Sequence, residues 1–203
     1  MPDRCLTIPV YYDFAATLCY VAHRVLARLD PQIRDLQISL DWRPIDLTSI
    51  TGWRRGARLQ EGARQNILRV MRDLDVEAAI PARWTDSRAA LAVALALRGS
   101  PSEIAWRERV WSAIFEEGRV ITGEGEIERL ARDLRIDLQS IDQAGAQRQL
   151  ARVTRDALGA GINGVPTFMF DNWPVGGIQE DRTMLTLFQR YARKKREPRG
   201  QPE

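Results

Sequence analysis

Residues 6–43 read LTIPVYYDFAATLCYVAHRVLARLDPQIRDLQISLDWR and contain three successive structural signals. The stretch Leu6 to Phe14 is rich in β-branched and aromatic residues, which predicts a strand buried on both faces. From Thr17, which is placed to cap a helix, apolar residues recur at three- and four-residue spacing until Asp30-Pro31. Alternation over Leu36 to Arg43 predicts a second strand. A strand, a helix and a strand in this order predict a right-handed parallel crossover.

The central part of the chain has a different character. Residues 49–158 show no strand pattern, and their apolar spacing predicts a block of helices over residues 58–74, 86–98, 102–117, 124–134 and 141–158. Proline and glycine interrupt the block between these segments, as they do at helix ends.

Strand character returns near the C-terminus. Val165 to Phe170 predicts a strand, Asp171-Asn172 a two-residue turn, and Trp173 to Val175 a returning strand. Because Pro174 cannot donate a backbone hydrogen bond, this last strand is expected at a sheet edge. An amphipathic helix is expected over residues 181–191.

This order of elements predicts an α/β protein, a small four-stranded sandwich that a helical block interrupts. The expected division is a core made of residues 1–48 and 159–192, a helical insertion of residues 49–158, and a disordered basic tail of residues 193–203.

Composition and charge exclude several classes of function. The 203 residues carry 30 basic and 27 acidic side chains, a net charge of +3 that is too small and scattered to predict nucleic-acid binding. No apolar run is long enough to span a membrane, and the N-terminus lacks a signal-peptide pattern. We therefore expect a cytoplasmic protein with reduced thiols and no membrane partner. Two cysteines and one histidine, His23, exclude a Cys/His zinc site, and no metal is expected.

Three stretches carry a family resemblance. Asp13-Phe14-Ala15-Ala16-Thr17-Leu18-Cys19-Tyr20 resembles the active-site strand and helix entry of DsbA-like thioredoxin-fold proteins, and Gly161-Ile162-Asn163-Gly164-Val165-Pro166-Thr167-Phe168 resembles their cis-proline loop. Trp42-Arg43-Pro44-Ile45-Asp46-Leu47 resembles a Trp-Arg-Pro-Phe segment of the same family. The resemblance covers roughly residues 6–190, is nearer the FrnE-type branch, and implies a thioredoxin fold with a helical insertion.

The chain departs from the family where the chemistry takes place. The FrnE-type branch reads Asp-Phe-x-Cys-Pro-Trp-Cys-Tyr, and the related 2-hydroxychromene-2-carboxylate isomerases and kappa-class glutathione transferases read Asp-x-x-Ser-Pro-Tyr-Ser. Ala16 stands at the position of the first cysteine or serine, Thr17 replaces the proline, and only Cys19 remains. Disulfide cycling needs an activated first thiol and a second thiol in reach. Cys5, about 25 Å away along an extended strand, is a poor substitute.

Three functions remain open. Cys19 could exchange with glutathione or a client thiol as a degenerate monothiol oxidoreductase. Alternatively, the Thr17 hydroxyl could serve a glutathione-dependent isomerase or transferase of the 2-hydroxychromene-2-carboxylate type. In the third case the protein is a catalytically silent module that binds a peptide, or glutathione, on the free backbone of Val165 at a cis Val165-Pro166 bond.

The candidate residues follow from these alternatives. The candidate catalytic positions are Ala16, Thr17 and Cys19, and the candidate substrate-binding residues are Asp13, Tyr20, Trp42, Val165 and Pro166. Structural interpretations stay open: Cys19 as a buried apolar residue, Asp13 as a solvated strand end rather than a proton relay, and Trp42 as a packing residue. No permanently bound cofactor is expected, glutathione is a possible co-substrate, the partner is a thiol-containing protein or small molecule, and a homodimer is possible.

Overall fold

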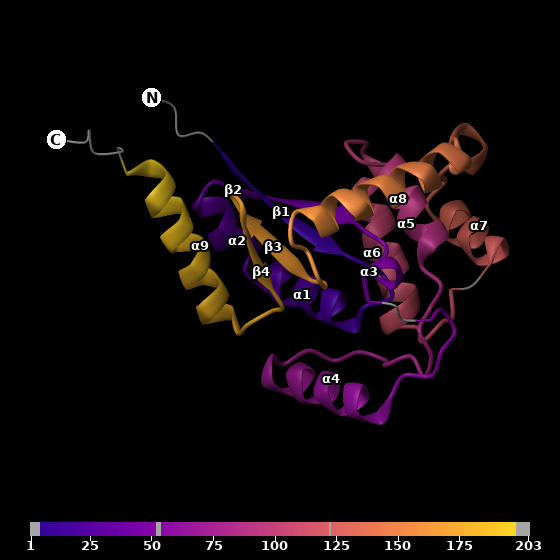
Figure 1. The fold of residues 1–203 in the computed structure, drawn as a ribbon, viewed down its shortest axis with the longest axis horizontal. Helices are drawn as coiled ribbons and strands as arrows, with labels where there is room; N and C mark the ends of the chain where they lie inside the picture. The colour runs from indigo at the N-terminus through magenta and orange to yellow at the C-terminus, as the bar shows by residue number, and fades with distance from the viewer. Residues whose placement is uncertain (1–4, 52–53, 122, 198–203) are drawn as a thin grey trace.

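The computed structural model describes residues 5–51, 54–121 and 123–197, and its centre is a four-stranded mixed sheet (Figure 1). The strands are β1 (Leu6–Tyr12), β2 (Ile38–Pro44), β3 (Thr167–Phe170) and β4 (Trp173–Gly176), in the order β2-β1-β3-β4. β1 and β2 are parallel, as the crossover pattern predicts, and β3 pairs antiparallel with both β1 and β4. The thioredoxin-like α/β fold predicted from the sequence is therefore confirmed.

The sheet is covered on both faces, but unequally. Phe168 packs against Phe188 of α9 (Asp181–Arg196), whereas its neighbour Met169 packs with Ala157 of α8 (Gln143–Gly159) on the opposite face. In β1 the alternate residues Ile8, Val10 and Tyr12 are buried, while Thr7 is exposed. The expectation that the first strand is buried on both faces is therefore wrong, because one face is covered only in part.

The helical block packs onto the sheet as part of the same core. It contains α3 (Thr48–Thr51), α4 (Glu61–Asp73), α5 (Arg88–Ala96), α6 (Ser102–Phe115), α7 (Glu124–Asp133), a 3₁₀ turn over Leu138–Ser140, and α8. Trp111 of α6 is fully buried and meets Trp42 of β2 with ring centroids 5.4 Å apart. Buried residues of β1, α1 (Thr17–Arg28), α9 and the block form one continuous hydrophobic cluster.

Several element boundaries differ from the sequence prediction. The first strand ends at Tyr12, and a short helix α2 (Asp30–Asp35) follows α1 where the sequence predicts only a stop, because a proline in the first turn is compatible with a new helix. The last helix continues to Arg196, so residues 193–196 are helical and not disordered. Lys195 pairs with Asp171 of the hairpin at 2.5 Å, which anchors this last turn. Residues 198–203 of the expected tail lie outside the described residues.

Candidate functional site

The N-terminus of α1 holds the position at which the sequence pattern places the first reactive group. Ala16 is the N-cap residue and Thr17 is the first residue of the helix, so the prediction that Thr17 caps α1 is wrong by one position. No side chain caps this helix end, and in the described part of the chain the Thr17 hydroxyl makes no hydrogen bond. Both residues are buried, at 6% and 3% exposure. A methyl group thus lies where the dipole and free N–H groups of the helix would activate a nucleophile.

Cys19 lies one turn further into α1, and its side chain has no exposed surface. Burial raises the pKa of the Cys19 thiol well above its ordinary value, a shift that a backbone hydrogen bond from Asp13 opposes and the Asp13 charge reinforces. Because the thiolate is the nucleophilic form, this environment disfavours exchange chemistry.

Asp13 connects three segments beneath the start of α1. Its Oδ1 accepts hydrogen bonds from the Ala15 N–H at 2.8 Å and the Ser87 hydroxyl at 2.5 Å, and its Oδ2 accepts one from the Leu47 N–H at 2.8 Å. The carboxyl group is fully buried, which is the main reason that its pKa is raised to about 6. Asp13 is therefore not a solvated strand end. It joins the α1 entry to the segment after β2 and to the start of α5.

The segment before β3 forms an open pocket of about 420 Å³. The pocket is lined by Val165, Pro166 and their neighbours Gly161, Asn163, Gly164, Thr167, Pro174, Gly176 and Gly177. The Val165–Pro166 peptide bond is cis, and the Pro166 carbonyl accepts a hydrogen bond from the Gly177 N–H at 2.8 Å. Within the described residues, neither the N–H nor the C=O of Val165 makes a hydrogen bond. The unpaired N–H and C=O of Val165 thus lie beside the pocket before β3.

The structure separates the remaining candidates from this pocket. Tyr20 is buried, stacks on Phe115 with centroids 5.0 Å apart, and donates a hydrogen bond to Glu116 at 2.9 Å. Trp42 packs against Trp111 and lines a different cavity. Of the eight predicted positions, only Val165 and Pro166 line the pocket before β3. The hydrogen bond between Ser87 and Asp13 was not predicted, and nothing in the sequence pattern around Ser87 points to it.

The described residues form neither a metal-binding cluster nor a helix that could span a membrane. Among them, no group of three or more His, Cys, Asp or Glu side chains is arranged to hold a metal ion. Of the helices in the described ranges, none has the length and apolar character needed to cross a membrane.

Comparisons with known proteins agree with the architecture. A family model described as "DSBA-like thioredoxin domain" matches residues 7–189. No curated protein sequence matches the chain. The fold is similar to that of a probable DsbA oxidoreductase from Streptomyces coelicolor, with a TM-score of 0.77 and 17% identity over 98% of this chain and 94% of that one.

Two further solved structures have the same fold. A 2-hydroxychromene-2-carboxylate isomerase gives a TM-score of 0.72 at 18% identity, with 95% of this chain and 97% of that one covered. A cytosolic disulfide reductase, DsbM, from Pseudomonas aeruginosa, whose structure is described with GSH, gives 0.58 at 19% identity over 94% and 97%. Likeness at such low identity shows a common fold, and the chemistry depends on the residues present at the site.

Proposed function

This chain belongs to the DSBA-like thioredoxin domain family, and we propose that within it the protein binds an extended polypeptide segment on the backbone of Val165 without carrying out thiol–disulfide exchange. The observation that carries the proposal is the unpaired N–H and C=O of Val165 beside the pocket before β3. A backbone donor and acceptor on one residue can pair with an added strand, as in other β-augmentation surfaces.

The α1 N-terminus supports the absence of exchange chemistry. Ala16 offers no nucleophile, and Cys19 has neither access to solvent nor a lowered thiol pKa. A monothiol reaction at Cys19 would first require the helix to open. The geometry therefore favours binding over the monothiol function.

A leucine at Gly164 tests the proposal directly. Gly164 lines the pocket, its φ is not in the left-handed region, and an added Cβ meets no atom within 4 Å. The Gly164→Leu variant should fold normally, and its leucine side chain should fill part of the pocket before β3. We expect it to weaken the binding of a fluorescently labelled, cysteine-free extended peptide by about tenfold or more, because the lost backbone pairing removes roughly 1–3 kcal/mol.

The matched control is Gly159→Leu. Gly159 also has open space around an added Cβ, has no positive φ, and lies at the end of α8 outside the pocket. Fluorescence anisotropy should give wild-type affinity for Gly159→Leu and for Cys19→Ser. Equal peptide affinity in Gly164→Leu and the wild type, or no peptide binding to the wild type, would contradict the proposal.

A second candidate rests on the Thr17 hydroxyl. Because this hydroxyl makes no hydrogen bond within the described residues, it is available to donate to a sulfur atom, which would suit a glutathione-dependent isomerase or transferase. In that case Thr17→Val should abolish turnover of a 2-hydroxychromene-2-carboxylate in the presence of glutathione, whereas Thr7→Val, at the exposed position of β1, should leave it unchanged. Absence of turnover by the wild type would exclude this candidate and leave peptide binding untouched.

A further inference from the structure

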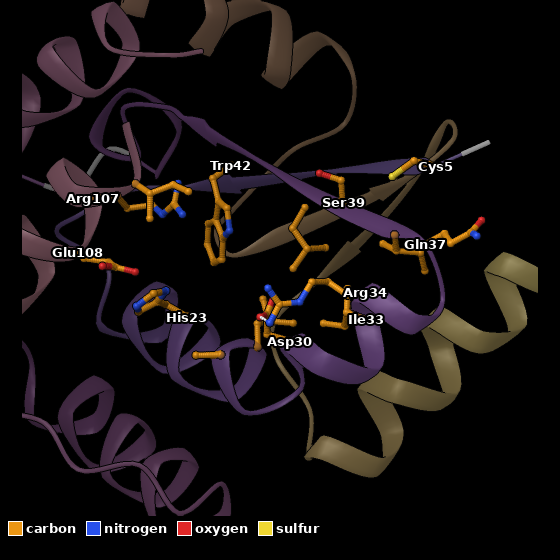
Figure 2. Close-up of a pocket in the computed structure, with 15 residues that line it drawn as sticks. Cys5, His23, Asp30, Ile33, Arg34, Gln37, Ser39, Trp42, Arg107 and Glu108 are labelled. Atoms are coloured by element: carbon orange, nitrogen blue, oxygen red, sulfur yellow. Dashed lines mark ion pairs between the residues drawn. The ribbon is translucent and has the colours of Figure 1, made fainter. Parts of the chain in front are cut away.

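A second and larger cavity, of about 630 Å³, lies between α1, α2, β2 and α6 (Figure 2). Its volume falls in the range of roughly 300–1,000 Å³ that is usual for small-molecule sites. Most of its lining is apolar, with Leu26, Ile33, Ile38, Leu40 and Ile104 among the contributing residues. It shares no residue with the pocket before β3.

The cavity contains a buried cation, Arg107, that forms no direct ion pair with the described residues. Arg107 of α6 is 8% exposed, forms no ion pair in the described ranges, and its Nε has no hydrogen-bond partner. Glu103 and Glu108 of the same helix act on Arg107 without a direct ion pair, and Glu103 accepts a hydrogen bond from the Gly99 N–H at 2.7 Å. Leaving a buried guanidinium unpaired is costly, and a structure that retains one has an empty place for an acceptor.

The Trp42 ring limits the directions from which a ligand can approach the Arg107 guanidinium. Its Cζ lies 5.1 Å from the centre of the Trp42 ring, so one face of the planar group is covered. Figure 2 shows Arg107, Trp42 and His23 together at one end of the cavity, with Asp30 and Arg34 further along it. Burial and the Arg107 charge lower the pKa of His23 to about 4, so the imidazole is neutral at pH 7 and adds no second cation.

The other charges restrict the ligand further. Asp30 and Arg34 form an ion pair and cancel each other, and Glu108 is an exposed carboxylate on the lining. A multiply charged anion would meet one buried cation and be repelled by Glu108. A singly charged group matches the site better, and a planar carboxylate fits the forked donors of a guanidinium.

We propose that this cavity binds a small carboxylate with an apolar body, the carboxylate on the Arg107 guanidinium and the body against Trp42 and the apolar lining. The Arg107 Nε, which is buried and has no hydrogen-bond partner, is the donor that such a carboxylate would satisfy.

Titration calorimetry with benzoate tests the site, with benzamide as the uncharged analogue of similar shape and inorganic phosphate as the anion without an apolar body. We expect benzoate to bind the wild type and the other two probes to bind much more weakly. Arg107→Met should lower benzoate affinity by about tenfold or more, because charge-assisted hydrogen bonds are lost. The double variant Asp30→Asn/Arg34→Met removes an ion pair of zero net charge from the same cavity and should keep near wild-type affinity.

A second variant changes the charge of the cavity at an exposed position and leaves the buried Arg107 and Trp42 in place. Ile104 is 59% exposed, so Ile104→Glu should fold and repel benzoate by adding a negative charge to the lining. Three results would overturn the proposal: no benzoate binding to the wild type, unchanged affinity in Arg107→Met and Ile104→Glu, or phosphate binding as strongly as benzoate. Peptide affinity at the pocket before β3 should be unaffected in every one of these variants.

Discussion

At the scale of single residues, the thiol of Cys19 is present but enclosed by the protein. Cys19 has no exposed surface, and its burial raises the thiol pKa. In a Cys5→Ser background, we expect iodoacetamide to modify Cys19 in the folded protein on the order of 100-fold more slowly than in urea, since modification requires local opening. Mass spectrometry over time measures both rates. Equal rates would show an accessible thiol and would restore the monothiol hypothesis.

Asp13 gives a second prediction at this scale, on pH. Its pKa is raised from an ordinary 3.8 to about 6 in the folded protein, so the unfolded chain loses this proton first as the pH rises. Between these values the folded state binds more protons, and stability from this group therefore falls as the pH increases. From pH 4 to pH 7, the wild type should lose about 2 kcal/mol relative to Asp13→Asn.

Urea unfolding of both proteins at several pH values measures this difference. The comparison between the two proteins matters, since Asp13→Asn also replaces an acceptor facing the Leu47 N–H and so shifts stability at every pH. A difference that stays constant from pH 4 to pH 7 would show that Asp13 does not titrate in this range.

At the scale of elements, α1 retains the geometry for dithiol chemistry without its first sulfur. A thiol introduced by Ala16→Cys would lie at the helix N-terminus, where thiol pKa values fall to roughly 3.5–7.5, and three residues before Cys19. We expect Ala16→Cys to form a disulfide with Cys19 in oxidised glutathione, detected by mass after alkylation. Ala15→Cys, equally buried but one residue out of register, should not form it. Failure of Ala16→Cys to do so would contradict the assignment of this helix end.

The elements also show where sequence patterns are informative. Apolar patterns and the breaks between them located α5, α6 and α7 to within a few residues. α7 has one buried face, whereas α5 is buried on every side over residues 90–95 and was delimited by the residues that flank it. The patterns missed α2 and α3, which are too short to show a period. For the site, local motifs identified Val165 and Pro166, whereas the hydrogen bond between Ser87 and Asp13 and the position of Arg107 against Trp42 join residues far apart in the chain. Such contacts depend on the packing of the helical block and leave no local signal.

At the scale of the whole molecule, the helical block and the sheet should unfold as one unit. Trp111 is fully buried and contacts Tyr12, Phe14, Trp42 and His23 across the junction. We expect Trp111→Ala to lower the free energy of unfolding by about 3–5 kcal/mol. Trp173→Ala, at a position 74% exposed, should change it by less than about 0.5 kcal/mol.

Urea unfolding followed by circular dichroism and by tryptophan fluorescence provides the measurement. The two probes should give coincident transitions in the wild type, with a lower midpoint in Trp111→Ala. Two separate transitions, with only one displaced by Trp111→Ala, would show that the block and the sheet unfold independently.

The alanine at the start of α1 has a consequence for how the protein responds to its surroundings. Thioredoxin-fold proteins with two active-site cysteines change state with the glutathione poise of their compartment. Here Cys19 is enclosed, and of the two described thiols only Cys5 is exposed, outside the sheet. Oxidants would therefore react first at Cys5, which lines the larger cavity with Arg107 and does not line the pocket before β3. Peptide binding at the pocket before β3 should therefore be the same in a reducing and in an oxidising environment, whereas ligand binding in the larger cavity should change when Cys5 is modified.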